Sequence, residues 1–200
     1  MSEKRKVVYL TGAPAAGKST LIRTLASTRP DVKVFEYGRM MSEKLGRGKA
    51  PGQGISQHTL RGGTSGRVTQ RDIDDLDTEM TDWIERYNSQ CHLVIDSHQV
   101  TIEPFGFRIS PFAQARLSAL KIDEFWLLVL DTGKTLERIQ RAPDGRPAPT
   151  PFQAEFHTHA QAALAAHYSV MTGRPVYVFD ASMPGLDLLS LAAARLDDCA

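Results

Sequence analysis

One eight-residue run near the start of the chain constrains its fold more than any other feature. It matches the pattern G-x-x-x-x-G-K-[ST] and comprises Gly12, Ala13, Pro14, Ala15, Ala16, Gly17, Lys18 and Ser19. The run lies between a short apolar segment and one of helical periodicity, so its N–H groups and the helix start are placed to bind phosphate. We therefore expect a phosphate-binding loop, extending to Thr20, that holds ATP, with Lys18 on the β- and γ-phosphates and the Ser19 hydroxyl on Mg²⁺.

Apolar runs of strand length alternate with segments of helical periodicity, a pattern typical of an α/β fold with a parallel sheet. Five strands are predicted, at residues 7–10, 32–35, 93–95, 125–130 and 176–179. The first, third and fourth are continuously hydrophobic, which indicates central strands buried on both faces. Helices are predicted at residues 19–27, 72–88, 112–120, 134–141, 152–171 and 186–196.

Length and composition narrow the class of protein further. The 200 residues suffice for a single domain whose core needs no disulfide and no structural metal. Because the formal net charge is only +1, the chain as a whole does not attract nucleic acid or anionic lipid. Cys91 and Cys199 lie outside any metal-ligand spacing, which favours reduced thiols. With no signal peptide or membrane-spanning run, we expect a cytoplasmic location, the host cytoplasm if the source is viral.

The third predicted strand ends in Asp96, the position from which a carboxylate reaches Mg²⁺ through water. The next residue is Ser97, whereas motor ATPases place there a glutamate that polarises water. The guanine signature N-K-x-D does not occur in the sequence, and the chain is too short for the helical subdomain of oligomeric ATPases. These features favour a kinase over an ATPase motor or a GTPase switch.

Further motifs follow the phosphate loop over most of the chain. They are Val34-Phe35-Glu36-Tyr37-Gly38, Val94-Ile95-Asp96-Ser97-His98, Leu130-Asp131-Thr132-Gly133, Glu137-Arg138-Ile139-Gln140-Arg141 and Tyr168-Ser169-Val170-Met171-Thr172-Gly173. With the loop, they resemble the P-loop nucleotide kinases, and most of all the archaeal-type adenylate kinases. The resemblance implies a five-stranded core that binds ATP, a small lid at about residues 138–152 and an acceptor-binding insertion at about residues 39–71. It also implies that Arg138 packs near adenine and phosphates, and that Arg141 and Arg146 close over them as lid arginines.

Two features depart from the adenylate kinase pattern. Where that pattern has an Asn-Arg pair before the last motif, this chain has Gln161-Ala162, so one phosphate-binding arginine is missing. In addition, Glu36 and Arg39 are similar to the D-x-x-R arrangement of polynucleotide kinases and other kinases that phosphorylate a hydroxyl group. An alcohol must lose its proton, so Glu36 is a candidate base, with Asp96 as its competitor, and Arg39 is a candidate phosphate ligand. The alternative is a surface ion pair between Glu36 and Arg39.

Residues 39–71 carry seven Lys and Arg side chains and one Glu, a local charge of seven minus one, or +6. Glycines are frequent there, so we expect a pliable basic loop that binds an acceptor with several phosphates, such as DNA or RNA. The resemblance favours Arg67, and then Arg61, as the ligand of an acceptor phosphate, and His98 is a further candidate contact. A solvated insertion with incidental charge is the alternative. The loop has no aromatic residue for base stacking, a role that Phe105 and Phe107 could fill.

Three hypotheses for the function follow. The first is an ATP-dependent kinase of the hydroxymethyl group of 5-hydroxymethyluracil in DNA, similar to phage enzymes of thymine hypermodification. The second is a nucleoside monophosphate kinase acting on free nucleotides, and the third is a non-catalytic nucleotide-binding switch. ATP and Mg²⁺ are the expected cofactors, and a nucleotide or DNA is the expected partner, without a membrane or a structural metal. His157 and His159 lie on different faces of a predicted helix, and we expect no metal site there.

Overall fold

Five parallel strands form the central sheet of the protein. The computed structural model describes residues 5–46, 68–97, 99–142 and 148–198. In spatial order the strands are β2 (Val32–Glu36), β3 (His92–Asp96), β1 (Val7–Gly12), β6 (Glu124–Val129) and β7 (Val176–Asp180). The prediction of a five-stranded parallel α/β sheet is confirmed, as is the central position of β1, β3 and β6.

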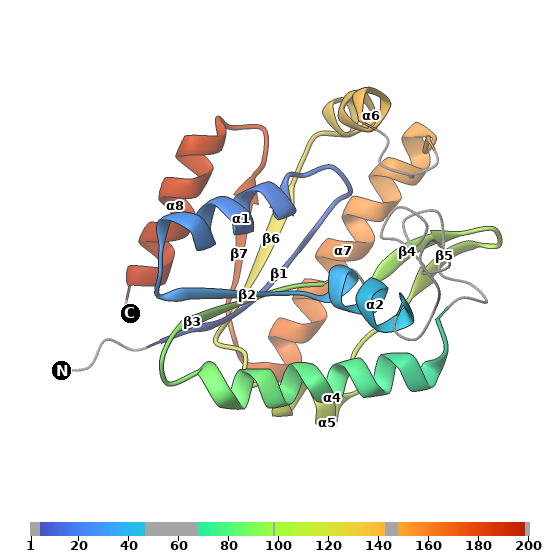
Figure 1. Ribbon diagram of the computed structural model, residues 1–200. Coiled ribbons are helices and arrows are strands. Elements are labelled where there is room, and N and C mark those ends of the chain that lie inside the picture. Colours follow the sequence, from blue (N-terminus) through green and yellow to red (C-terminus); the bar gives the residue numbers. More distant parts are fainter. Residues whose placement is uncertain (1–4, 47–67, 98, 143–147, 199–200) are drawn as a thin grey trace.

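Helices cover both faces of the sheet (Figure 1). On one face lie α1 (Lys18–Thr28) and α8 (Gly185–Asp197), and on the other lie α4 (Gln70–Tyr87), α5 (Gln114–Ala119) and α7 (Pro151–Thr172). Strand alternation sends Val8 and Leu10 into the first core and Val7 and Tyr9 into the second. In the described ranges, no helix combines the length and the apolar character needed to cross a membrane.

Two parts of the chain differ from the prediction. Residues 39–71 were expected to form a pliable loop, but the first of them lie in helix α2 (Tyr37–Gly46), and residues 47–67 lie outside the described ranges. A β-hairpin of β4 (Val100–Glu103) and β5 (Gly106–Ile109) was not predicted at all. Both elements are short and bury little, so their hydrophobic patterns are weak. Helix α6 (Thr132–Arg141) forms close to its predicted bounds.

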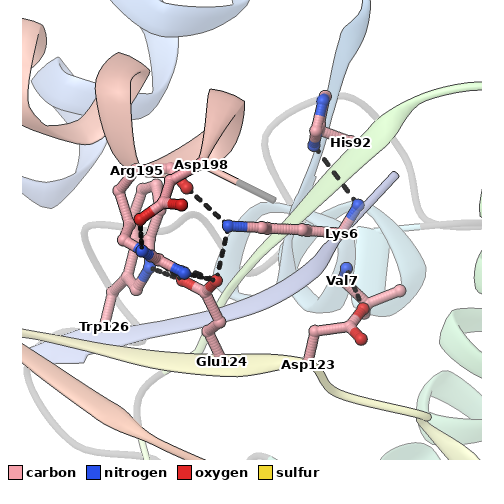
Figure 2. Close-up of polar contacts among 8 residues, drawn as sticks. All are labelled: Lys6, Val7, His92, Asp123, Glu124, Trp126, Arg195 and Asp198. Carbon is pink, nitrogen blue, oxygen red and sulfur yellow. Dashed lines mark hydrogen bonds and ion pairs between the residues drawn. The ribbon is translucent and has the colours of Figure 1, made fainter. Parts of the chain in front are cut away.

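A buried ion-pair network joins the amino end of the sheet to α8 (Figure 2). The Glu124 carboxylate lies 2.7 Å from Lys6 Nζ and 2.8 Å from Arg195 Nη2, and Trp126 Nε1 donates a 3.0 Å hydrogen bond to it. The Glu124 side chain is only 4% exposed, so its charge is stable there because several donors surround it. This network belongs to the end of the sheet opposite the phosphate loop, and it stabilises the fold.

Candidate active site

The phosphate loop connects β1 to α1, and two of its glycines are required by its geometry. Gly12 has a φ of 150°, and a Cβ built there would lie 2.3 Å from the carbonyl oxygen of Leu128. Gly17 is left-handed, with a φ of 88°, and it occupies the N-cap position of α1. The first N–H groups of α1 therefore face the loop without a side-chain cap, which is an arrangement that binds phosphate.

Lys18 lies folded over this loop. Its side chain is buried, and Nζ donates hydrogen bonds to the carbonyl oxygens of Gly12 (2.7 Å) and Ala13 (3.1 Å). Just before the loop, the Thr11 hydroxyl donates a 2.7 Å hydrogen bond to Gln161 Oε1 of α7. Gln161 occupies the sequence position where the adenylate kinase pattern has its Asn-Arg pair. Its buried amide is hydrogen-bonded to the residue that precedes the phosphate loop, and this contact helps to position the loop.

A cleft of about 960 Å³ opens from the phosphate loop along the carboxyl ends of β2 and β3. Ligands of parallel α/β sheets bind at this edge, because the strand ends and helix starts face outward there. The hairpin β4–β5 and helices α2, α4, α5, α6 and α7 complete the walls of the cleft. The cleft is lined by the phosphate loop, apart from the buried Ala13, and by Glu36, Arg39, Asp96, Arg138 and Arg141. The structure thus brings these predicted site residues together.

Two carboxylates end neighbouring strands in the cleft. Glu36 and Asp96 are register partners of β2 and β3, and Asp96 is 5% exposed. The Glu36 carboxylate lies 3.4 Å from Arg39 Nε, and the guanidinium of Arg39 also approaches Glu43 at 3.6 Å. In this conformation, Glu36 and Arg39 form the ion pair that was the alternative to their catalytic roles.

The arginines of α6 occupy two different environments. Arg138 donates hydrogen bonds to the carbonyl oxygens of Ala15 in the phosphate loop (3.2 Å) and of Ala181 (3.1 Å). Arg141 pairs with Glu137 at 2.5 Å, and its side chain is 76% exposed at the margin of the cleft. Arg138 therefore lies beside the phosphate loop and Arg141 is paired with Glu137, while their roles as phosphate-side and lid arginines stay predictions.

The basic segment is partly neutralised where it is described. Lys44 Nζ lies 2.9 Å from Glu79 and 3.6 Å from Asp75, both on α4, and Arg39 is paired as described above. Four residues that the sequence singled out, Arg61, Arg67, His98 and Arg146, lie outside the described residues. Their roles therefore remain predictions.

Sequence reasoning missed a polar cluster in the half of the cleft away from the phosphate loop. The Tyr37 hydroxyl donates a 2.8 Å hydrogen bond to Asp77, and Arg116 Nε lies 3.8 Å from the same carboxylate. Burial raises the pKa of Asp77, against the Tyr37 hydrogen bond and the Arg116 charge, and burial also raises the pKa of Tyr37. A signal was present in the sequence, because Asp77 falls on the apolar stripe of α4, between Ile73 and Met80.

His157, which the sequence analysis considered only as a metal ligand, also lies in the cleft. It lines the cleft from α7, it is only 6% exposed, and its ring lies edge-on to Phe107 with centroids 5.8 Å apart. Burial, followed by the charge of Lys18, lowers the pKa of His157 to about 4, against the effect of a hydrogen bond to the Val100 backbone. The imidazole is therefore neutral at pH 7.

The residues present fit a nucleotide phosphate and Mg²⁺. The glycine geometry, the start of α1 and Lys18 match a phosphate group, and Ser19 and Asp96 offer hard oxygen ligands in the same cleft. Among the described residues, no group of three or more His, Cys, Asp or Glu side chains is placed to hold a metal ion by itself.

Comparisons with known proteins agree with this geometry. A family model described as AAA domain matches residues 11–151, while no curated protein sequence matches the chain. Among solved structures, a sugar kinase from Janibacter sp. HTCC2649 has 14% identity and a TM-score of 0.52, covering 98% of this chain and 96% of that one. A tunicamycin resistance protein from Deinococcus radiodurans has 16% identity and a TM-score of 0.56, covering 96% and 95%. At these identities the likeness shows the fold alone, an α/β fold with a five-stranded parallel sheet.

Proposed function

Since the chain belongs to the AAA domain family and shares its fold with P-loop kinases, we propose that it transfers the γ-phosphate of ATP to a hydroxyl group. One observation carries the choice of a hydroxyl acceptor. Two carboxylates, Glu36 and Asp96, end adjacent strands inside the cleft that starts at Lys18. A phosphate acceptor is already an anion and needs no base, whereas a hydroxyl nucleophile does.

The residues divide the work of the transfer. Bound Mg²⁺ would neutralise charge on the β- and γ-phosphates, with Ser19 and Asp96 as its ligands, Asp96 through water. Lys18 and the N–H groups at the start of α1 hold the phosphates, and Arg138 holds the loop itself. Glu36 accepts the proton of the acceptor hydroxyl, whose oxygen forms a bond to the γ-phosphorus while the bond to the ADP oxygen breaks. Arg39, released from Glu36, then faces the acceptor or the transferring phosphoryl group.

For the acceptor, we propose the hydroxymethyl group of 5-hydroxymethyluracil in DNA. Two features support this acceptor. Glu36 is a candidate base for a hydroxyl group, and residues 39–71 carry a net charge of +6, which favours contact with the phosphates of DNA. Phe105, at the turn of the β4–β5 hairpin, is 95% exposed and can stack on a base. The hairpin residues Thr101, Ile102 and Arg108 line the cleft, so the hairpin that carries Phe105 forms part of its wall.

A nucleoside monophosphate kinase remains the second candidate, because the motif resemblance to adenylate kinases is longer than the departures from it. The third candidate is a switch that binds nucleotide without transfer. A switch needs no groups directed at a transition state, so Lys18, Asp96 and the two α6 arginines together disfavour it.

The test is an acceptor panel with radiolabelled ATP and Mg²⁺. The acceptors are a hydroxymethyluracil oligonucleotide, its thymine counterpart, AMP, dTMP and a mixture of nucleosides. We expect label in the first oligonucleotide and none in the thymine control. Efficient labelling of AMP or dTMP alone would establish the monophosphate kinase instead. Binding of ATP without labelling of any acceptor would favour the switch.

A further inference from the structure

The polar cluster of Tyr37, Asp77 and Arg116 is a part of the cleft that the proposed mechanism leaves unused. The Tyr37 hydroxyl donates a 2.8 Å hydrogen bond to Asp77 Oδ1. Arg116 Nε lies 3.8 Å from Oδ2, which makes an ion pair but is too long for a hydrogen bond. The three residues line the cleft from α2, α4 and α5. Tyr37 directly follows Glu36, so the chain connects this cluster to the proposed proton acceptor.

Two groups of the cluster can still bind a ligand. Within the described part of the chain, Tyr37 is the one hydrogen-bond donor to Asp77, so Oδ2 has lone pairs available. The guanidinium of Arg116 makes no hydrogen bond to a described residue, which leaves N–H groups available beside that oxygen. Neither group is sealed off, because the Asp77 side chain is 9% exposed and that of Arg116 is 29% exposed. The cluster therefore presents an acceptor and a donor next to each other.

The surroundings of this pair indicate what kind of group it binds. A phosphate is disfavoured beside Asp77, because Asp74, one turn earlier on α4, also lines the cleft, and the two carboxylates would repel it. Ile73, on the same face of α4, and Phe112, just before α5, line the cleft as apolar walls. A flat, uncharged ring with an N–H group beside a carbonyl group matches these features. The hydrogen-bonding edge of uracil has this form.

We propose that Asp77 and Arg116 bind the Watson–Crick edge of the acceptor base, with N3–H donating to Asp77 Oδ2 and a neighbouring carbonyl oxygen accepting from the Arg116 guanidinium. Tyr37 is a positioning residue that holds the carboxylate by its other oxygen. This inference rests on the proposed function and deepens it, because it selects the base: N3 of cytosine carries a lone pair, which the carboxylate repels. The edge is accessible when the base is single-stranded or flipped out of the duplex.

Asp77→Asn tests the selection of the base. The variant keeps the shape of the side chain, and the Tyr37 hydroxyl holds the amide oxygen, so the NH₂ group replaces Oδ2. With single-stranded oligonucleotides, we expect the wild type to prefer hydroxymethyluracil over 5-hydroxymethylcytosine by about 10²-fold in kcat/KM, and D77N to reduce this ratio by about tenfold or more. Arg116→Met keeps the apolar stem and should raise the KM for the hydroxymethyluracil oligonucleotide about tenfold. Asp75→Asn, on the same helix at a side chain 52% exposed, is the control and should keep the wild-type ratio.

A binding measurement uses the wild-type protein and does not depend on the folding of a variant. With a non-hydrolysable ATP analogue bound with Mg²⁺, N3-methylation of the hydroxymethyluracil should weaken binding of the oligonucleotide about tenfold, because it removes the N–H group. An N3-methyl group on a thymine elsewhere in the strand should have no effect.

The outcomes separate the inference from the proposed function. If the wild type phosphorylates the hydroxymethyl group while a folded D77N keeps the wild-type ratio, or while N3-methylation leaves the affinity unchanged, the inference is wrong and the proposed function stands. If no hydroxyl group is phosphorylated, the proposed function fails, and the inference with it.

Discussion

Glu36 and Asp96 lie opposite each other at the carboxyl ends of β2 and β3, so both carboxylates reach the same side of the sheet edge. Their surroundings differ, because Glu36 is paired with Arg39 at 3.4 Å whereas Asp96 is 5% exposed. A partly exposed ion pair and a buried carboxylate suit different tasks. We assign proton acceptance to Glu36 and magnesium binding through water to Asp96.

Glu36→Gln should slow phosphate transfer by about 10²-fold or more, because the amide cannot accept the hydroxyl proton. The KM for ATP and the magnesium requirement should change little, while Asp96→Asn should raise the magnesium concentration needed for half-maximal rate. Glu43→Gln is a matched control, since Glu43 also approaches Arg39, at 3.6 Å, and lies on α2. A nearly silent Glu36→Gln would return the role of base to Asp96 or favour a phosphate acceptor.

Lys18→Met should reduce transfer by about 10²-fold to 10³-fold, because it removes a charge that acts on the transferring phosphoryl group. The methionine keeps most of the buried stem, so the variant should remain folded by circular dichroism. Thermal unfolding with and without Mg·ATP separates binding from catalysis, since a ligand of the native state raises the melting temperature. Equal transfer by the wild type and the variant would contradict the assignment of the loop.

Salt dependence tests a DNA acceptor at the binding step. Each phosphate that lysine or arginine contacts should add about 0.7 to 0.9 to the slope of log binding constant against log salt. We expect a slope of magnitude two or more for the hydroxymethyluracil oligonucleotide, measured by fluorescence anisotropy with the ATP analogue bound. A slope near zero would indicate an acceptor that the basic segment does not contact.

The Glu124 network predicts a specific acid sensitivity. Burial raises the pKa of Glu124, but hydrogen bonds from Arg195, Lys6 and Trp126 outweigh it, and the net shift is downward. The stabilisation is therefore complete above the ordinary glutamate pKa of about 4.3 and is lost as the pH falls below that value. Glu124→Gln should lower the free energy of unfolding at pH 7 by about 3 kcal/mol, and the deficit should shrink toward pH 3.

Asp198→Asn is the control for this prediction, because Asp198 contacts the same arginine but its side chain is 48% exposed. Its loss should cost less than about 1 kcal/mol at any pH. Chemical denaturation at several pH values measures both effects. A Glu124→Gln deficit that does not change with pH would show that the loss comes from packing alone.

The sequence predicted the sheet and the phosphate loop because both depend on local patterns. Continuous apolar runs identified β1, β3 and β6, and the glycine spacing identified a loop whose Gly12 has no room for a Cβ. The capping box of α4 is local as well, because it forms between Thr69 and Asp72, three residues apart. Each of these signals lies within a few neighbouring residues.

The acceptor half of the cleft depends on contacts between distant segments. Tyr37 contacts Asp77 across 40 positions in the sequence, and His157 of α7 lines the same cleft as the phosphate loop at the other end of the chain. Both Asp77 and His157 are polar residues on the buried stripe of an amphipathic helix. Such residues mark a site or a buried hydrogen bond, and the sequence does not say which.

The most direct test of the central claim follows the oxygen of the acceptor. A hydroxymethyluracil oligonucleotide whose hydroxymethyl oxygen is ¹⁸O is phosphorylated with ATP and Mg²⁺, and ³¹P NMR of the product reports whether ¹⁸O is bonded to phosphorus. If the protein is a hydroxyl kinase, the bridging oxygen of the new phosphate ester carries the label. Release of inorganic phosphate with an unmodified oligonucleotide would contradict the account, because water would then be the nucleophile.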